Sequence, residues 1–376
     1  MPLESPEFRT SLQKLLVGLI LILVPLTVFG FYVALQGDSH MRQMNGENFR
    51  AMTLTSAEST SQFIATCVRD VSVIANTPGP VQAVTLANRQ YEHLSEEAVT
   101  TKIDAIEQAW ESSQTDGLSS KILTSDLAQQ LRRMRELDPT LLKITVADVT
   151  GATVAATERP VHYFQTDRES WRAIATRSQG TIHVSDVRYD DQTHLYYVGI
   201  AYPILQEGTG RFIGAVTAMA DVSPVFAQLN RLQMGRTGRM FLAREDGTVI
   251  EAPGVTPAMQ MKSEEYAAIK DALGSLRGRE TGYIYATLAN GQSYLIGFAD
   301  TGLKEAYPNL PWIVLASQEA RELNSPIRNM TAFALLVMIL ALLMLTLLGA
   351  YVFLHRRQEL EDIETPDNKG SPLAAA

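Results

Sequence analysis

The sequence predicts an α+β fold, in which a long N-terminal helix and two tandem antiparallel-sheet modules lie between two transmembrane helices. Three observations predict it: two long uncharged runs, apolar residues at helical spacing after the first run, and two series of β-branched runs separated by turns. A hydrophobic content of 46% and a charged content of 19% lie in the range of globular domains. The part between the uncharged runs is therefore expected to form a packed core.

The two uncharged runs extend from Leu15 to Leu35 and from Thr331 to Leu354. About 20 apolar residues cross the hydrocarbon core of a bilayer, so we predict a transmembrane helix in each run. A cleaved signal peptide is the alternative for the first run, but the apolar region of a signal peptide has only about 7 to 15 residues. The predicted segments are a cytoplasmic N-terminus (1–14), transmembrane helix 1 (15–35), an outer segment (36–330), transmembrane helix 2 (331–354) and a short disordered cytoplasmic tail (355–376).

Basic residues at the helix ends predict the orientation. Arg9 and Lys14 precede the first run, and Arg356 and Arg357 follow the second. Because cytoplasmic flanks carry an excess of Lys and Arg, both ends of the chain are expected inside the cell. We therefore expect a bacterial inner (plasma) membrane protein whose residues 36–330 are extracytoplasmic, in the periplasm.

Helical periodicity continues after the first run. Apolar residues recur at helical spacing from Met41 to Ile74, which predicts a long helix that leaves the membrane. It is expected to end at Asn76–Pro80, where Pro and Gly stop a helix. Shorter helices are predicted around Ile103–Trp110 and Leu123–Met134.

Strand signals then appear in two similar series. The first holds "LKITVADVTGATVAAT", "GTIHVSDVRYDDQTHLYYVGIAYPI" and "RFIGAVTAMAD", and the second holds "GRMFLAREDGTVIEAP", "TGYIYATLANGQSYLIGFAD" and "PWIVLASQEA". A nearly constant spacing separates three pairs of landmarks, which predicts two similar modules in tandem, at about 141–221 and 236–320. These pairs are Gly151 with Gly247, Gly199 with Gly297, and Asp221 with Ala320.

Composition and motifs exclude several function classes. A net charge of -9 argues against a nucleic-acid partner, which needs a basic face. Cys67 is the only cysteine, so an intrachain disulfide or a cysteine-based metal site is impossible. The chain has no G-x-S-x-G, G-x-x-x-x-G-K-[ST] or H-E-x-x-H motif. We therefore expect no catalytic residues, no cofactor and no enzymatic activity.

The order of these features resembles the double Cache (dCache) family of sensor domains. The resemblance covers about residues 37–325 and is carried by "DVTG", "AYPI", "FIGAVTAMAD", "MGRTGRMFLAREDGTVI" and "LPWIVLASQEA". It implies two PAS-like antiparallel sheets beside a long helix outside the membrane. It also implies a small-ligand site in the membrane-distal module, which is the first module of this chain.

The resemblance also implies ligand-binding residues. In the amino-acid-binding branch of the family, a Tyr, an Arg five residues later, an aromatic pair and an Asp at a later strand end surround the ligand. Tyr163, Arg168, Trp171 and Asp221 match this pattern, whereas Ser170 stands at the first aromatic position of the pair. The substitution at Ser170 departs from the family pattern at a residue that would contact an amino acid.

The residue types fit this chemistry without the family. A guanidinium such as that of Arg168 pairs with a carboxylate through two parallel hydrogen bonds, and Asp221 can accept from an ammonium group. Tyr163, Trp171 and Tyr189 offer apolar walls with polar edges, as small-ligand pockets do. The alternative is that Arg168 and Asp221 pair with one another or with solvent, as most surface charges do.

A second cluster has metal-ligand residue types but is expected to form a turn. Asp and Asn favour turns, and "YDDQTH" lies between two strand-like runs, so we expect no metal there. The cluster consists of His183, Asp186, Asp190, Asp191 and His194.

These features predict a membrane-anchored extracytoplasmic sensor for an amino acid or a related organic acid or amine. The alternative is a structural or accessory membrane subunit that keeps the fold and binds no ligand. Relatives commonly continue into a HAMP relay and an output domain, and none fits in His355–Ala376. We therefore expect signalling through a separate partner protein, which contacts the transmembrane helices at small residues that allow close approach, and we expect a homodimer. These small residues are Gly18, Gly30, Gly349 and Ala350.

Overall fold

The computed structural model describes residues 6–112, 116–165, 169–175, 181–232, 234–255, 259–273, 281–323, 336, 338–340, 342–344, 346–347 and 349–351. Before residue 39, the side chains are described only for Gly18, Leu21 and Pro25. The chain divides into a compact unit, Gln43–Glu322, and a second unit made of the residues on either side of it. The two units are described separately below.

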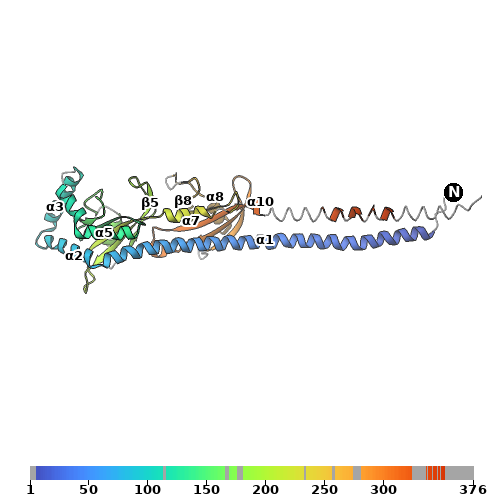
Figure 1. Cartoon of the computed structure of the whole chain (residues 1–376), viewed down its shortest axis with the longest axis horizontal. Helices are drawn as coiled ribbons and strands as arrows, with labels where there is room; N and C mark the ends of the chain where they lie inside the picture. Colours follow the sequence, from blue (N-terminus) through green and yellow to red (C-terminus); the bar gives the residue numbers. More distant parts are fainter. Residues whose placement is uncertain are drawn as a thin grey trace, which may run out of the picture. The chain divides into compact units, whose positions relative to one another are not determined.

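Helix α1, Pro6–Asn76, is the long helix that the sequence predicts. It ends at Asn76 because Thr77 is extended and helix α2, Pro78–Asn88, begins with a proline. From Gln43 onward α1 belongs to the compact unit, where it runs beside both sheets (Figure 1). Its packed face repeats every three or four residues, as an amphipathic helix requires. The buried residues of this face include Phe49, Ala57, Ile64, Cys67, Val68, Val71 and Ile74.

Short helices lead from α1 to the first sheet. Ser95 and Ser125 start two of them as N-caps, because each hydroxyl accepts a hydrogen bond from a backbone N–H three residues later. Ile103 and Trp110 lie on the buried face of one helix and Leu127 and Leu131 on that of another, which confirms the two predicted helical regions. The segments are η1 Arg89–Tyr91, α3 Glu96–Glu111, α4 Asp116–Thr124 and α5 Asp126–Leu137.

The first module contains a six-stranded antiparallel sheet in the order β2-β1-β6-β5-β3, with β4 also paired to β5. Helix α2 covers one face, since a Cβ on Gly214 would lie 2.8 Å from Val84. Helix α6, Glu169–Ala175, packs on part of the other face. The strands are β1 Leu141–Asp148, β2 Thr153–Ala156, β3 His183–Val184, β4 Arg188–Asp190, β5 Leu195–Leu205 and β6 Phe212–Asp221.

Helix α7, Ser223–Arg231, connects this sheet to the second module, a five-stranded antiparallel sheet in the order β8-β7-β11-β10-β9. Its core includes Phe241, Phe298 and Leu315. The strands are β7 Arg239–Arg244, β8 Val249–Glu251, β9 Thr281–Thr287, β10 Ser293–Asp300 and β11 Trp312–Glu319, and the helices are α8 Glu264–Leu273, α9 Leu303–Ala306 and α10 Ala320–Leu323.

The two sheets have the same strand order, which confirms that the second half repeats the first. Strands β2-β1-β6-β5 correspond to β8-β7-β11-β10. Gly151 and Gly247 occupy the same turn in the two modules, with φ of 88° and 85°, a conformation that glycine adopts without strain. Gly199 and Gly297 lie on the corresponding strands β5 and β10.

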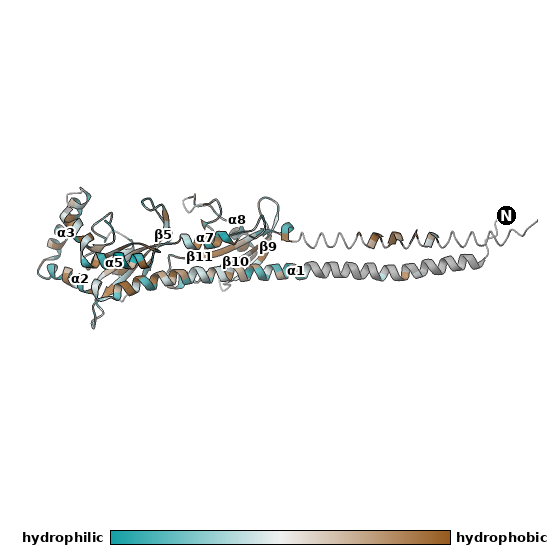
Figure 2. Cartoon of the chain, viewed as in Figure 1, coloured by the Kyte–Doolittle hydropathy of each residue, from teal (hydrophilic) through white to brown (hydrophobic). Residues whose placement is uncertain are grey.

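The second unit is helical in its described parts. The run from Leu15 to Leu35 lies within α1. In the C-terminal run, those residues between 336 and 351 that the structure describes are helical and mostly hydrophobic (Figure 2), and large apolar side chains such as Met344 and Leu347 are exposed. Residues 331–335, 337, 341, 345, 348 and 352–354 of this run lie outside the described part. Among the residues described well enough to be assessed, no helix is long and apolar enough to span a bilayer.

Candidate functional site

A cavity of about 450 Å³ lies against the first sheet, on the face opposite helix α2. Side chains of a strand alternate between the two faces, so Lys143 and Thr145 of β1 share one face. Cross-strand pairing places Thr145 opposite Thr217, and both Lys143 and Gly199 opposite Met219. These five residues form the floor of the cavity.

The walls come from segments that cross over this face. They are the stretch between β2 and α6, the start of α6, and the strands β3 and β4 with their connection. Together with the floor, these segments bring charged groups of both signs to a small volume, and among the described residues the two signs are equal in number. The charged lining residues are Lys143, Arg159 and Arg188 on the positive side, and Glu158, Glu169 and Asp190 on the negative side.

Lys143 is held by acceptors at the base of the cavity. Its Nζ lies 3.1 Å from Glu158 Oε1 and 3.2 Å from Asp190 Oδ2, and it donates to Gln192 Oε1 at 2.7 Å. Burial lowers the pKa of Lys143, but hydrogen bonds and charges from Glu158 and Asp190 outweigh it and raise this pKa overall. The Lys143 ammonium is therefore charged and already neutralised by the protein.

The pKa of the Asp190 carboxylate is shifted in the opposite direction to that of Lys143. Burial raises its pKa, but hydrogen bonds from Thr193 and Lys143, together with the charge of Lys143, outweigh burial and lower the pKa overall. Thr193 Oγ1 donates to Asp190 Oδ2 at 2.8 Å. The sequence motif "YDDQTH" thus folds as a turn whose first Asp fixes Lys143.

The two arginines of the cavity differ in how firmly they are held. Arg159 stacks 4.6 Å from the centre of the Trp110 ring and donates to the Trp110 carbonyl at 2.9 Å. Arg188 pairs with Glu169 at 3.3 Å, and these side chains are 54% and 66% exposed. An ion pair this exposed stabilises the fold by only about 0 to 1 kcal/mol. A ligand can therefore replace the contact between Arg188 and Glu169 with little loss in the free energy of unfolding.

Two of the residues predicted to bind ligand can be placed beside the cavity, but not in its lining. Tyr163 is buried, its ring centre 5.8 Å from that of Trp110, and burial raises the pKa of its hydroxyl. Trp171 of α6 is buried against Phe212 at 5.7 Å between ring centres. Trp171 packs in a hydrophobic cluster that includes Ala201, and Ala201 pairs with Thr217 of the cavity floor. Trp171 therefore covers the sheet at one end of the cavity.

The other predicted residues lie further out. Tyr189 is 46% exposed and contacts His194 Nδ1 through its hydroxyl at 3.1 Å. Asp221 ends β6 on the face of Thr217 and accepts from the Ser223 amide at 2.8 Å. Arg168 lies outside the described residues. Of the five predicted ligand-binding residues, the four described ones do not line the cavity, so their contact with a ligand stays a prediction.

Several residues that line the cavity were not predicted from the sequence. Lys143, Glu158 and Arg188 come together only once strand register and the path of the β2–α6 segment are known. One signal for Lys143 was present in the sequence. Along "LKITVAD", polar Lys143 and Thr145 alternate with buried Ile144 and Val146, which marks a polar face on an otherwise apolar strand. Ser170, where the family pattern has an aromatic residue, also lines the cavity.

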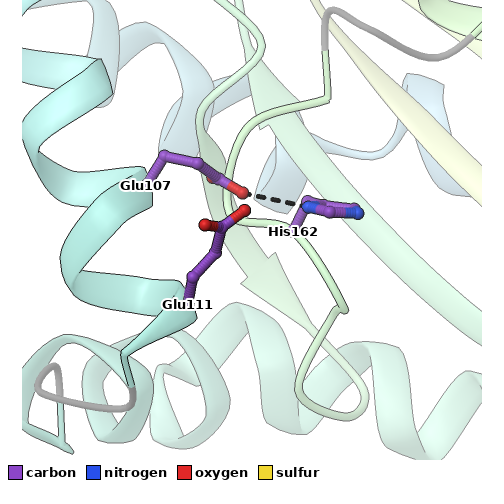
Figure 3. Close-up of side chains that lie close together, drawn as sticks. All are labelled: Glu107, Glu111 and His162. Carbon is purple, nitrogen blue, oxygen red and sulfur yellow. Dashed lines mark hydrogen bonds and ion pairs between the residues drawn. The ribbon is translucent and has the colours of Figure 1, made fainter.

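The residues of metal-ligand type that were expected to form a turn make different contacts. His183 and Asp190 line the cavity, His194 contacts Tyr189, and Asp186 binds Arg244. A different group, Glu107, Glu111 and His162, brings three potential metal ligands within 4.8 Å of one another among the described residues (Figure 3).

Hydrogen bonds already account for the geometry of this second group. Glu107 Oε1 lies 3.1 Å from His162 Nδ1 (Figure 3). Glu107 Oε2 accepts from the Phe164 amide at 2.8 Å. Glu111 lies one turn later on the same helix, α3. Glu107 therefore ties α3 to the segment that carries Val161 and Gln165 into the cavity wall.

Comparisons with known proteins agree with this architecture. The sequence profile of the Cache domain family, dCache_1, matches residues 39–327. The sensory domain of the Campylobacter jejuni chemoreceptor Tlp3 (CcmL) is 12% identical with a TM-score of 0.50, and the match covers 76% of this chain and 98% of that one. At this identity the likeness shows the fold alone. The comparison with curated proteins gave no match.

Two further solved structures are similar. The ligand-binding domain of the Pseudomonas fluorescens chemoreceptor CtaA, in complex with L-isoleucine, is 15% identical with a TM-score of 0.46 and covers 76% of this chain and 97% of its own. The ligand-binding domain of Pseudomonas aeruginosa PctB, in complex with L-Arg, is 16% identical with a TM-score of 0.41 and covers 76% and 95%.

Proposed function

The chain belongs to the Cache domain family through its dCache_1 region, and on this premise we propose that it is a membrane-anchored extracytoplasmic sensor for an amino acid or a related organic acid or amine. Domains of this family are extracytoplasmic ligand-binding modules of membrane receptors that take part in signalling. One observation carries the ligand class. Among the described residues, three cationic and three anionic side chains line the cavity on the first sheet, so it suits a small molecule with both charges.

A zwitterion fits the exposed ion pair of Arg188 and Glu169. Its carboxylate would pair with the Arg188 guanidinium and its ammonium with the Glu169 carboxylate, so no charge would be left without a partner. Lys143 would contribute little to binding, because Glu158 and Asp190 already neutralise it. Arg168 and Asp221 remain the second proposed pair for the same two groups.

Ligand-induced stabilisation of the purified full-length chain tests this proposal. A ligand present at 100 times its dissociation constant raises the free energy of unfolding by about 2.7 kcal/mol. We expect at least one member of a panel of L-amino acids, organic acids and amines to raise the unfolding temperature. If none does, the chain is instead an accessory membrane subunit that keeps the fold without a ligand.

Membrane anchoring is proposed from the two uncharged runs, Leu15 to Leu35 and Thr331 to Leu354. Exposed apolar side chains in the described part of the second run support it, since water-soluble proteins seldom expose so many together. We place the protein in the inner membrane with its Cache domain in the periplasm. Fractionation that leaves the chain in the soluble fraction would contradict this.

We also propose that the chain is a homodimer and that a separate partner protein receives its signal at the transmembrane helices. Small residues support such a contact, because they let helix backbones approach closely. Gly18 is exposed, and a Cβ built on it would meet nothing within 4 Å; Gly349 and Ala350 lie near the end of the second run. Crosslinking in membranes followed by purification would reveal both a second copy and a partner.

A further inference from the structure

The segment between β3 and β4 contacts two different parts of the compact unit. His183 and Ser185 line the ligand cavity of the first module. Between and after them, Val184 and Asp186 contact the second module: the Val184 carbonyl accepts from Asn309 Nδ2 at 3.2 Å, and Asp186 binds two further side chains. Along this stretch of backbone, neighbouring residues thus contact the cavity and the second module in alternation.

Asp186 binds the second module with both carboxylate oxygens. Oδ2 accepts from Arg244 Nε at 2.5 Å, and Oδ1 accepts from Trp312 Nε1 at 3.0 Å. Oδ1 also accepts from the Val187 amide at 2.8 Å, which fixes the rotamer of the carboxylate. The side chains of Arg244 and Asp186 are only 24% and 27% exposed, and Trp312 is buried, so solvent screens these contacts partially.

The two partners of Asp186 lie on central strands of the second sheet. Arg244 is the last residue of β7 and Trp312 the first of β11, and the two are directly opposite in the ladder. Asp186 therefore holds one end of the β7–β11 pair. Strand β11 continues from Trp312 to Glu319 and leads without a gap into α10, Ala320–Leu323, at the C-terminal boundary of the compact unit.

A displacement of the cavity wall also changes the contacts that Asp186 makes with the second module. Asp186 follows Ser185 directly in the chain, and Arg188 of the exposed ion pair lies two residues further. If β3 and β4 close on a bound molecule, Asp186 moves with them. It must then either pull on Arg244 and Trp312 or lose its hydrogen bonds to them, because packed interfaces switch between discrete arrangements rather than deform continuously.

We propose that Asp186 is the residue that couples occupancy of the first-module cavity to the second module, through Arg244 and Trp312. This inference rests on the proposed function, because it requires a molecule to bind in the cavity. Asp186 is a positioning residue: it does not itself need to touch the bound molecule. The coupling is reciprocal, so loosening the contact changes how the second module responds as well as how the cavity closes.

Hydrogen–deuterium exchange on the full-length chain tests the coupling. The probe is the L-amino acid that most raises the unfolding temperature of the wild type. In the wild type, the probe should slow exchange in peptides of β3–β4 and also in peptides of β7 and β11. In Asp186→Asn, which replaces Oδ2 by a donor facing Arg244, the change in β3–β4 should remain while most of the change in β7 and β11 is lost.

Two further variants make the test specific. Trp312→Phe keeps the aromatic packing but removes the Nε1 donor, so it should reduce transmission in the same way. Asp246→Asn breaks an ion pair of similar type with Lys262 inside the second module and should leave transmission intact. Transmission that survives in both Asp186→Asn and Trp312→Phe, or that is lost equally in Asp246→Asn, would overturn the inference.

A cavity-filling variant separates this inference from the proposed function. Thr217→Phe places a ring on the cavity floor and replaces the bound molecule as the perturbation. If no amino acid on the panel binds, the proposed ligand class is wrong. Thr217→Phe should nevertheless alter hydrogen–deuterium exchange in β7 and β11. Adding Asp186→Asn to Thr217→Phe should remove that effect. A Thr217→Phe effect that is the same with and without Asp186→Asn would contradict the coupling.

Discussion

Gly297 of β10 lies directly against the backbone of Phe49 in helix α1. A Cβ built on Gly297 would come within 3.0 Å of the carbonyl carbon, the carbonyl oxygen and the Cβ of Phe49. No side chain other than hydrogen fits between this strand and the helix without displacing backbone. The contact fixes how closely α1 approaches the second sheet.

We therefore expect Gly297→Ala to lower the free energy of unfolding by about 1 to 3 kcal/mol, the usual cost of overpacking a core. Thermal or urea unfolding of the full-length chain measures this. Gly117→Ala is the matched control, because a Cβ there would meet nothing within 4 Å and Gly117 lies in helix α4. The control should leave stability unchanged or raise it slightly. Equal losses in both variants would contradict the close contact.

Glu322 makes the stability of the second module depend on pH. The Thr237 hydroxyl and the Arg236 and Thr237 amides donate to its carboxylate and lower its pKa from 4.5 to about 2. A lowered folded-state pKa stabilises the fold fully above pH 4.5, and this contribution is lost as the pH falls towards 2. Glu322→Gln should therefore be less stable than the wild type at neutral pH, and the difference should shrink in acid.

Unfolding temperatures measured from pH 7 downwards check this prediction, and Glu305→Gln on α9 provides a control at an exposed glutamate. The control should follow the wild-type curve. A constant difference between Glu322→Gln and the wild type across the whole acid range would mean that the Glu322 carboxylate has no protonation-linked role.

Two pairs of residues compete for the role of ligand partner. If Arg168 holds a ligand carboxylate in a partly desolvated site, Arg168→Ala should weaken binding by about 2 to 5 kcal/mol. If Arg188 at the cavity mouth holds it, Arg188→Ala should weaken binding about tenfold, or roughly 1.4 kcal/mol. Calorimetric titration with the best amino acid of the panel distinguishes the two.

The charge partners sharpen this comparison. Asp221→Ala should follow Arg168→Ala, and Glu169→Gln should follow Arg188→Ala, if each pair binds the two ends of one zwitterion. Arg172→Ala is the control, since this exposed arginine on α6 does not line the cavity. Unchanged affinity in all four site variants would place the ligand elsewhere.

The proposed contact with a partner protein predicts an uncoupling variant in the membrane. Gly349→Leu should abolish signalling and leave ligand affinity unchanged, because a bulky side chain there prevents close helix approach. Deletion of 359–376, which lie outside the described residues, should leave signalling intact. The reverse pattern, a silent Gly349→Leu and an inactive deletion, would show that the tail makes the contact.

The elements of the fold could be predicted because their signals are local. Pro78, at the start of α2, stops α1 where expected, and Gly151 and Gly247 mark turns that need a positive φ. The repeat could be predicted because the two modules keep their turns and strands at nearly constant spacing. Such signals depend on a few neighbouring residues and survive without any knowledge of tertiary contacts.

The side-chain site could not be predicted to the same degree because it depends on contacts between distant segments. Tyr163 has the residue type of a ligand contact, but Trp110 on α3 covers it. Lys143 reaches Glu158 and Asp190 only through the pairing of strands far apart in sequence. The cavity lies in the first module, where the family resemblance implies a ligand site, whereas which side chains face the cavity is decided by strand register and by the crossing segments.

Helix α1 also determines how this protein can be recombined with others. Its residues from Gln43 to Asn76 run beside both sheets (Figure 1). Phe49 packs on β10 of the second sheet, and Ser59 hydrogen-bonds Gln228 of α7, the helix that connects the two sheets, at 3.2 Å. In a chimaera that exchanges only the strands of one module, the packing face of α1 would therefore not match the new sheet. Grafting a new specificity onto this fold will succeed only if the donor supplies the matching stretch of α1 with its sheet.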